Sequence, residues 1–254
     1  MLTAAEITQY HEDGYIVPDF RLSDEILAAI RFDQQRLFEA HPEFQDYCPN
    51  LLAYDLTFLN YARIPEIVDM VDQLIGPDFA LWNSSLFAKP ARTGRETPWH
   101  QDGEYWPIRP VATCTVWMAI DASTPQNGCL RVIRGSHKDR QLKSHNTNPD
   151  PSFTLNQELA PDAYDEADAV DIILEAGQMS LHDVFLVHGS AANKSAYPRR
   201  GMTLRYMPLT SHFDRDLAAA QTREKELLVG HENRTLFLMH GRDVSGLNDF
   251  QMRQ

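Results

Sequence analysis

The stretch PWHQDGEYWPIRP, residues 98–110, places a His-x-Asp pair among the aromatic side chains of Trp99, Tyr105 and Trp106. Short runs of strand-forming residues lie on both sides of it, and turn-forming residues bound each run. Because helical patterns do not alternate with these runs, the sequence predicts a β-sandwich or closed barrel and not a parallel βαβ sheet. The runs are ALWNSSLFAKP (80–90), ATCTVWMAID (112–121), GCLRVIRGS (128–136), AVDIILEAG (169–177), MSLHDVFLVHGS (179–190) and GMTLRYMPL (201–209).

The region before these runs has the periodicity of helices. Thr3 and Glu6 have the spacing of a capping box, which predicts a short opening helix. Ser23 is a typical N-cap for a second helix, and a third begins with proline in its first turn and ends at a Gly-Pro pair. The three helices are expected at residues 4–12, 23–41 and 64–77.

These patterns predict one domain that spans residues 1–254. The polar segment 138–169 has little apolar periodicity, which favours a long insertion loop, either a lid over the site or a plain surface loop. Beyond the last core strand, a helix is expected at 215–230 and a short strand in RTLFLMHG. The parts are a mainly helical N-terminal region (1–79), a strand-rich core (80–210) and a C-terminal helix and strand (211–254).

Charge and composition exclude several kinds of partner. The formal net charge of −13 disfavours nucleic acid and anionic membranes, because no basic surplus is present to replace counterions at phosphates. The acidic start MLTAAEITQYHEDGY is not that of a signal peptide, and no apolar stretch approaches a membrane span. Three widely spaced cysteines are typical of reduced thiols. A cytoplasmic protein with a small-molecule ligand is expected, and its oligomeric state stays open.

A His-x-Asp pair is weak evidence for a metal site, since the chain contains five His-x-acid triplets. Residues i and i+2 of a strand point to the same face, whereas in a helix they diverge. Only His100 and Asp102 lie among aromatic and apolar neighbours, as a partly dry site between strands requires. The other four lie at helix ends, in a turn or in a polar connection: His11/Asp13, His41/Glu43, His137/Asp139 and His212/Asp214.

His100 and Asp102 supply only two ligands. A non-haem Fe(II) centre of the two-histidine, one-carboxylate type needs a second histidine as the third. The candidate is His188, which ends a strand-like run 86 residues after Asp102. A histidine at a strand end is more often structural, and His182 on the same nominal strand face is an alternative. The residues alone do not choose between them.

Three segments together resemble the phytanoyl-CoA dioxygenase family of Fe(II)/2-oxoglutarate-dependent oxygenases. They are WHQDGEYWPIRP, NGCLRVIRGSHK (127–138) and HGSAANKSAYPRRG (188–201), in the family's order and spacing. The opening LTAAEITQYHEDGYIV is similar to the family's N-terminal helix, so the likeness covers about residues 2–20 and 80–208. The resemblance implies a mainly β protein with flanking helices and a double-stranded β-helix core, the jelly roll of cupin-like proteins.

The resemblance also implies roles for particular residues. His100, Asp102 and His188 would be the iron ligands and the catalytic centre. Arg199, eleven residues after His188, would hold the 2-oxoglutarate carboxylate, for which a planar guanidinium is well suited. A register slip of one residue would give this role to Arg200.

Further positions would contact the cosubstrate or substrate. Ser190 matches a position that hydrogen-bonds the same carboxylate, and Trp117 resembles a tryptophan of the cosubstrate pocket, or else a core side chain. Gln101, between two ligands, should point to the opposite face of a regular strand. Ser85 and Lys89, on the strand before the motif, match positions of cosubstrate or substrate contact; a solvated lysine is the alternative.

The activity implied by the family uses Fe(II), 2-oxoglutarate and O2, and hydroxylates an unactivated C–H bond with release of succinate and CO2. Since Asp102 is present, hydroxylation is favoured over halogenation. Tyr105 and Trp106 could form an aromatic wall for a cationic substrate or pack in the core. No basic cluster for a CoA phosphate tail is evident, so a small polar metabolite is expected. The alternatives are a non-catalytic jelly-roll binding or sensor protein and a zinc-dependent hydrolase.

Overall fold

The computed structural model describes residues 1–224 and 230–253 and contains mainly antiparallel strands with helices around them. The helices are α1 (Ala4–Asp13), α2 (Asp24–Ala40), α3 (Leu51–Tyr54), α4 (Leu59–Ala62), α5 (Pro65–Ile75) and α6 (Arg215–Glu224). The strands up to the metal-site motif are β1 (Tyr15–Ile16), β2 (Tyr47–Cys48), β3 (Phe79–Lys89) and β4 (Thr97–His100). Those after it are β5 (Ile108–Arg109), β6 (Cys114–Ala119), β7 (Leu130–Ile133), β8 (His145–Thr147), β9 (Gln157–Leu159), β10 (Ala169–Ile172), β11 (Met179–Asp183), β12 (His188–Ser190), β13 (Arg199–Pro208), β14 (His212–Phe213) and β15 (Phe237–His240).

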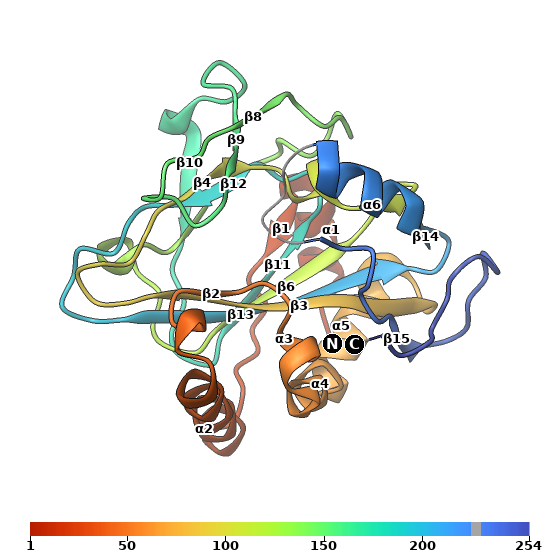
Figure 1. The fold of residues 1–254 in the computed structure, drawn as a ribbon, viewed down its shortest axis with the longest axis horizontal. Helices are drawn as coiled ribbons and strands as arrows, with labels where there is room; N and C mark the ends of the chain where they lie inside the picture. The colour runs from red at the N-terminus through yellow and green to blue at the C-terminus, as the bar shows by residue number, and fades with distance from the viewer. Residues whose placement is uncertain (225–229, 254) are drawn as a thin grey trace.

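Two antiparallel sheets form the core. The larger has the order β1-β11-β6-β13-β3-β15, with β2 also paired to β3, and the smaller has the order β10-β7-β12-β4. Helices α2 to α5 lie on one side of the larger sheet, and β4, β10 and β12 lie on the other (Figure 1). The predicted β-sandwich is therefore confirmed, in the jelly-roll form with flanking helices.

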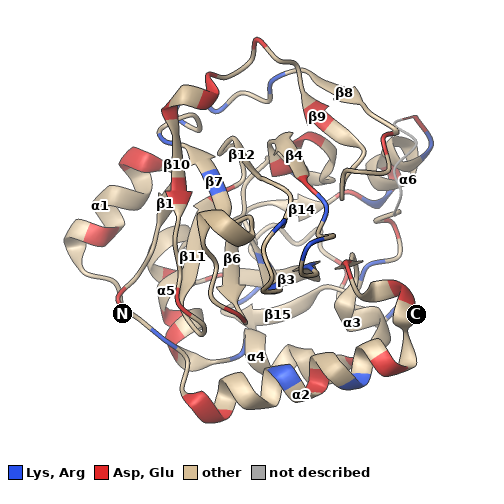
Figure 2. Ribbon diagram, turned by 90° about the vertical axis from the view of Figure 1, so that its left-hand side faces the viewer, with Lys and Arg blue, Asp and Glu red and all other residues tan. Residues whose placement is uncertain are grey.

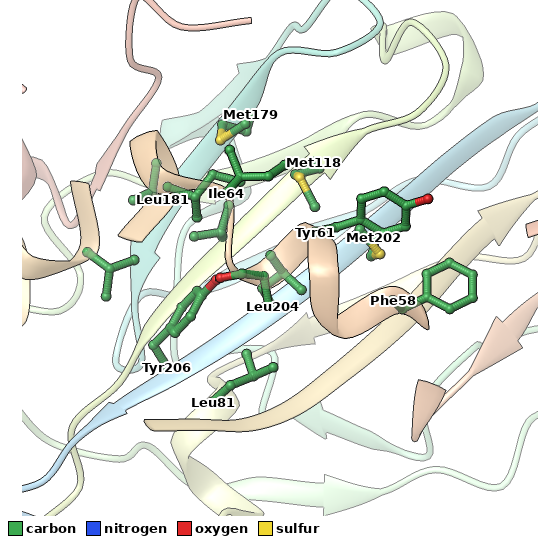
Figure 3. Close-up of a cluster of buried hydrophobic side chains, with 14 of the residues drawn as sticks. Phe58, Tyr61, Ile64, Leu81, Met118, Met179, Leu181, Met202, Leu204 and Tyr206 are labelled. Atoms are coloured by element: carbon green, nitrogen blue, oxygen red, sulfur yellow. The ribbon is translucent and has the colours of Figure 1, made fainter. Parts of the chain in front are cut away.

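The two faces of β13 show how the larger sheet serves both the apolar core and the cavity. Met202, Leu204 and Tyr206 are fully buried in the apolar cluster beneath the helices (Figure 3). Thr203 and Arg205, one residue out of phase, point to the opposite face and line a cavity between the sheets. Because side chains alternate along a strand, one strand supplies both the core and the cavity.

The predicted N-terminal helices are confirmed together with their caps. Thr3 caps α1, and its capping box with Glu6 is complete. The Ser23 side chain accepts a hydrogen bond from the amide of Ile26 at the start of α2. Helix α5 begins at Pro65 and ends before Gly76, as its sequence predicts.

The prediction of one continuous strand through MSLHDVFLVHGS is wrong. The segment forms β11 in the larger sheet and β12 in the smaller sheet, with Val184–Val187 crossing between them. Asp183 makes the turn, because its Oδ1 accepts from the amide of Phe185 and its carbonyl accepts from the amide of Leu186. The crossing residues are buried, so their apolar character imitates a strand.

The long polar insertion is more ordered than a plain loop. Its strands β8 and β9 pair as an antiparallel hairpin, and a 3₁₀ turn, Glu166–Asp168, precedes β10. His212, expected in a polar connection, lies in β14 and pairs with β5.

At the C-terminus the expected helix is α6, and the remainder of that prediction, residues 225–229, lies outside the described residues. The expected final strand is β15. No helix in the described ranges has both the length and the apolar character to cross a bilayer.

Candidate metal centre

His100 and His188 lie directly opposite each other on β4 and β12, two antiparallel strands of the smaller sheet. Their ring centroids are 4.2 Å apart. Strand β4 ends at His100, and the chain turns at once into a short 3₁₀ helix, Asp102–Tyr105. Asp102 therefore reaches the histidines from a turn, and the His-x-Asp pair does not continue along one regular strand as expected.

One ligand atom from each of His100, Asp102 and His188 lies within 4.8 Å of the others, and all three side chains are buried. The Oδ1 atom of Asp102 is 3.6 Å from Nε2 of His100 and 3.9 Å from Nε2 of His188. These three atoms converge from a sheet and a turn on one point, as the ligands of a single ion do.

Both imidazoles are held in the tautomer that a metal requires. Nδ1 of His100 lies 2.8 Å from the carbonyl oxygen of Pro98, and Nδ1 of His188 lies 2.9 Å from that of Leu186. A carbonyl can only accept, so each Nδ1 carries the proton and each Nε2 presents a lone pair to the cluster. Burial, together with the neighbouring His100, holds the pKa of His188 well below its usual range, so this ring is neutral at neutral pH.

Asp102 is the anionic member of the cluster. Burial acts to raise its pKa, but the neighbouring His100, His182 and His188, together with Arg205, outweigh burial and hold the pKa well below its usual range. Two imidazoles and one carboxylate match the donor set of a non-haem Fe(II) centre and leave positions open for other ligands. The same donors also suit zinc, so the metal identity depends on the rest of the cavity.

Arg199 lies in the same cavity as the three candidate ligands. Its Nε and Nη2 donate to the carbonyl oxygen of Gly128 at 3.1 and 2.8 Å, and its guanidinium lies 5.1 Å from the Trp117 ring centroid. Nη2 also donates to Ser190 Oγ at 3.4 Å. Burial lowers the pKa of Arg199 to about 10, so it remains cationic at neutral pH.

Arg200, the alternative, points the other way. Its Nε and Nη2 each donate to a different oxygen of Asp121 at 2.7 Å. This ion pair is complete without a ligand, whereas no carboxylate among the described residues contacts Arg199. The alternation of β13 thus puts Arg199 and not Arg200 on the cavity.

The cavity between the sheets is small, with a volume of about 40 Å³. Ser190 and Trp117 line it, as expected from the sequence. Its lining comprises Phe87, Thr97, His100, Asp102, Thr115, Trp117, Leu130, His182, His188, Ser190, Arg199, Thr203 and Arg205.

Gln101, Ser85 and Lys89 are buried but do not line this cavity. The Gln101 amide donates to the carbonyls of Gln141 and Phe185, so this side chain ties the end of β4 to neighbouring loops. Lys89 Nζ donates to the carbonyls of Arg95 and Ser190. Their contacts are with the protein, which explains their burial without a bound molecule.

Ser85 reaches the site through another residue. Its hydroxyl donates to the carbonyl of Pro49 and accepts from Nη1 of Arg205, which does line the cavity. Arg205, Thr203 and Phe87 were not singled out from the sequence. Thr203 and Arg205 share the two-residue period of β13, because they follow Arg199 on one of its faces, whereas Phe87 reaches the cavity from β3.

His182 lies beside the candidate ligands and not among them. Its Nε2 is 3.6 Å from Oδ2 of Asp102, whereas the other two histidines approach Oδ1. Its ring packs 4.9 Å from that of His188. Because the two histidines lie on strands of different sheets, the shared strand face expected from the sequence does not exist.

Comparison with known proteins identifies relatives of this chain. The sequence model of the phytanoyl-CoA dioxygenase (PhyH) family matches residues 2–201. Human peroxisomal phytanoyl-CoA dioxygenase is 30% identical over 183 residues, which are 69% of this chain and 53% of that protein. A Stutzerimonas stutzeri protein described as "Probable alpha-ketoglutarate-dependent hypophosphite dioxygenase" is 27% identical over 57% of this chain and 50% of its own length. The chain thus spans about half the length of these curated relatives.

The fold has solved counterparts as well. The apo structure of the non-heme monooxygenase ThoJ aligns with a TM-score of 0.75 and 24% identity, over 98% of this chain and 87% of the other. At this identity the likeness supports the jelly-roll fold and carries no information about substrate.

Proposed function

Because the chain belongs to the phytanoyl-CoA dioxygenase family, we propose that it is an Fe(II)- and 2-oxoglutarate-dependent oxygenase that hydroxylates an unactivated C–H bond of a small, polar metabolite. One observation carries the proposal. A cluster of two imidazoles and a carboxylate shares its cavity with Arg199, a buried guanidinium that no carboxylate of the described chain neutralises. A hydrolytic zinc site has no need of such an anion clamp, whereas a dicarboxylate cosubstrate does.

His100, Asp102 and His188 would hold the ferrous ion. When bound, the ion would couple the oxidative decarboxylation of 2-oxoglutarate by O2, which yields succinate and CO2, to oxidation of the substrate. The chain's own part begins with the two carbonyls at the Nδ1 atoms, which keep both rings in the binding tautomer before any metal arrives.

Arg199 would bind the distal carboxylate of 2-oxoglutarate. The Gly128 carbonyl occupies Nε and Nη2 on one side of the guanidinium and fixes its plane, while the Trp117 ring lies against its face. Ser190 Oγ, beside Nη2, would donate to the same carboxylate. These contacts would orient the guanidinium for the cosubstrate, which would replace the long contact of Nη1 with the Phe87 carbonyl at 3.4 Å.

The cavity walls would keep water from the reacting carbon. Phe87, Trp117 and Leu130 supply apolar surface among the polar groups of the lining. Exclusion of water favours the coupled reaction over side reactions of the activated cofactor.

A spectroscopic titration tests the proposal. Anaerobic protein that receives Fe(II) and then 2-oxoglutarate should develop a weak metal-to-ligand charge-transfer band in the visible, and omission of either component should remove the band. His188→Ala should abolish the band. His11→Ala is the matched control, because His11 is an exposed histidine of another His-x-Asp pair, at the end of α1, and its loss should leave the band unchanged.

Absence of the band in the wild-type protein, or its persistence in His188→Ala, would contradict the proposed function and favour a zinc site. A band without succinate formation under air, across a panel of small polar metabolites, would instead favour a binding or sensor protein. Substrate-stimulated succinate release identifies the substrate and supports the oxygenase.

A further inference from the structure

Arg205 is a second buried arginine in the cavity, and the proposed function assigns no role to it. It is 6% exposed and lies on the same face of β13 as Arg199. Its Nη1 donates to Ser85 Oγ at 2.8 Å, and its guanidinium lies 5.1 Å from the Trp106 ring centroid and 5.7 Å from that of Phe87. Its Nε has no hydrogen-bond partner within the described ranges, although the atom is buried.

No Asp or Glu of the described chain lies within ion-pair distance of Arg205. The charges of Asp102 and Arg205 do interact, but the Asp102 carboxylate belongs to the metal cluster. The other strong charge nearby is positive. Arg234 is also buried, and desolvation with a contribution from Arg205 lowers its pKa to about 10.

Arg234 differs from Arg205 because each of its three guanidinium nitrogens donates a hydrogen bond. It donates to Asn83 Oδ1, His231 Nδ1 and the carbonyl of Pro49, all of them neutral acceptors. Arg234 therefore adds positive potential while all three of its nitrogens are engaged, whereas Nε of Arg205 is buried without a partner among the described residues. An isolated buried charge is costly, so a site of this kind is completed by an anion.

We propose that Arg205 binds an anionic group of the substrate, so that the enzyme acts on small carboxylates or chemically similar organic anions. This inference rests on the proposed function and names the substrate class for the same cavity. The substrate's charged end would lie against Arg205, and its carbon skeleton would extend toward the metal cluster. Because Nη1 donates to Ser85, the guanidinium offers Nε and Nη2. These two donors match the two oxygens of a carboxylate.

The same geometry argues against a cationic substrate. The indole of Trp106 packs at 4.7 Å from Trp82, and Arg205 already lies against its face. An ammonium group would therefore meet a ring that a guanidinium occupies, beside two positive charges. Apart from Asp102 in the cavity, many acidic residues lie on the outer helices α1, α2 and α5 (Figure 2).

The cosubstrate is the other anion that the cavity must bind, and Arg199 has the geometry for it. Arg199 and Arg205 are six residues apart on one extended strand, so their backbones are separated by about 20 Å. A five-carbon dicarboxylate held at Arg199 would direct its other end to the metal cluster, which leaves Arg205 for a second anion, the substrate.

Matched probes test the charge preference directly. Protein loaded anaerobically with Fe(II) and 2-oxoglutarate is titrated with 3-phenylpropionate, 3-phenylpropanamide and 3-phenylpropylamine, and then with butyrate, butyramide and butylamine. Binding is followed by the shift of the charge-transfer band and by the midpoint of thermal unfolding. The carboxylates should bind at least about tenfold more tightly than the amides, and the amines should bind most weakly.

Variants assign the preference to a residue. In Arg205→Leu the ratio between carboxylate and amide affinity should fall to about one, while Arg205→Lys should retain part of it. Arg63→Leu removes an exposed arginine instead and should leave the preference unchanged, which separates a local from a net-charge effect. If Arg205→Leu does not fold, Ser85→Ala should lower the preference by removing the hydroxyl that holds Arg205.

Three results would overturn the inference: equal binding of carboxylates and amides to the wild type, a preference that survives Arg205→Leu, or a loss of 2-oxoglutarate affinity in Arg205→Leu with probe binding unchanged. The proposed function is judged separately by the charge-transfer band of the wild type. If that band is absent, the unfolding midpoint of the metal-free protein still reports which probes bind.

Discussion

The two faces of the larger sheet are equally buried, yet they have opposite chemistry. On the helix-covered face, strands β6, β11 and β13 present apolar side chains that pack against Phe58 and Ile64 (Figure 3). On the cavity face, the same strands present Thr115, His182 and Arg205. A one-residue step along a strand separates the two sets. The difference indicates that stability resides on one face and chemistry on the other.

The cavity face carries groups that a core does not tolerate. The hydroxyl of Ser180, both ring nitrogens of His182 and Nε of Arg205 are buried without hydrogen-bond partners in the described part of the chain. Each such group weakens the fold unless a ligand or water satisfies it. The apolar face offsets this cost, which allows the cavity to keep polar groups ready for ligands.

The largest expected effect comes from a ligand on the cavity face. His100→Ala should weaken Fe(II) binding by more than about 100-fold and reduce turnover below detection, because two protein ligands remain. The free energy of unfolding of the metal-free protein should change by less than about 2 kcal/mol. Metal titration and urea unfolding measure the two quantities. A large loss of metal-free stability would mean that this face also carries the fold.

A change on the helix-covered face should do the opposite. Leu204→Ala should lower the free energy of unfolding by about 3 kcal/mol, because Leu204 is fully buried in the apolar cluster. The Kd for 2-oxoglutarate of the folded protein should stay unchanged. Thr203→Ala, one residue away on the cavity face, is the matched control and should cost about 1 kcal/mol. Equal losses for the two variants would contradict the division between the faces.

A smaller effect is expected within the cavity itself. Arg199→Lys keeps the positive charge but removes the planar pair of donors, so the Kd for 2-oxoglutarate should rise about 30-fold. Metal binding should be unaffected, since Arg199 is not among the clustered ligand atoms. Titration of 2-oxoglutarate into the Fe(II)-loaded protein measures the change. An affinity equal to that of the wild type would remove Arg199 from the cosubstrate site.

Local sequence signals predicted the helices that cover the apolar face of the larger sheet. The capping box of α1 and the proline that begins α5 depend on neighbouring residues alone, and both predictions are confirmed. The grouping of His100, Asp102 and His188 needed the family resemblance, because nothing local relates positions 86 residues apart. Their roles as ligands stay a prediction until a metal is bound.

Features that depend on tertiary context were missed. The crossing from β11 to β12 has neither glycine nor proline, and its turn is made by the Asp183 side chain, so the buried run imitates one long strand. The hairpin of β8 and β9 has little apolar alternation to reveal it. Arg205 shares the two-residue period of Arg199, but only the assembled cavity reveals that no carboxylate pairs with it.

The smallest expected effect is on Fe(II) affinity when His182, a neighbour of the candidate ligands, is replaced. His182 lies 3.6 Å from Oδ2 of Asp102, and Thr115 donates to that same oxygen at 3.4 Å, so both help to turn Oδ1 toward the two histidines of the cluster. His182→Phe keeps the ring and its burial but removes the nitrogens, and Fe(II) affinity should fall about tenfold. Fe(II) titration of His182→Phe and His100→Ala side by side shows which variant loses more affinity. A loss as large as that of His100→Ala would make His182 a fourth ligand, and no loss would leave Thr115 alone to orient the carboxylate.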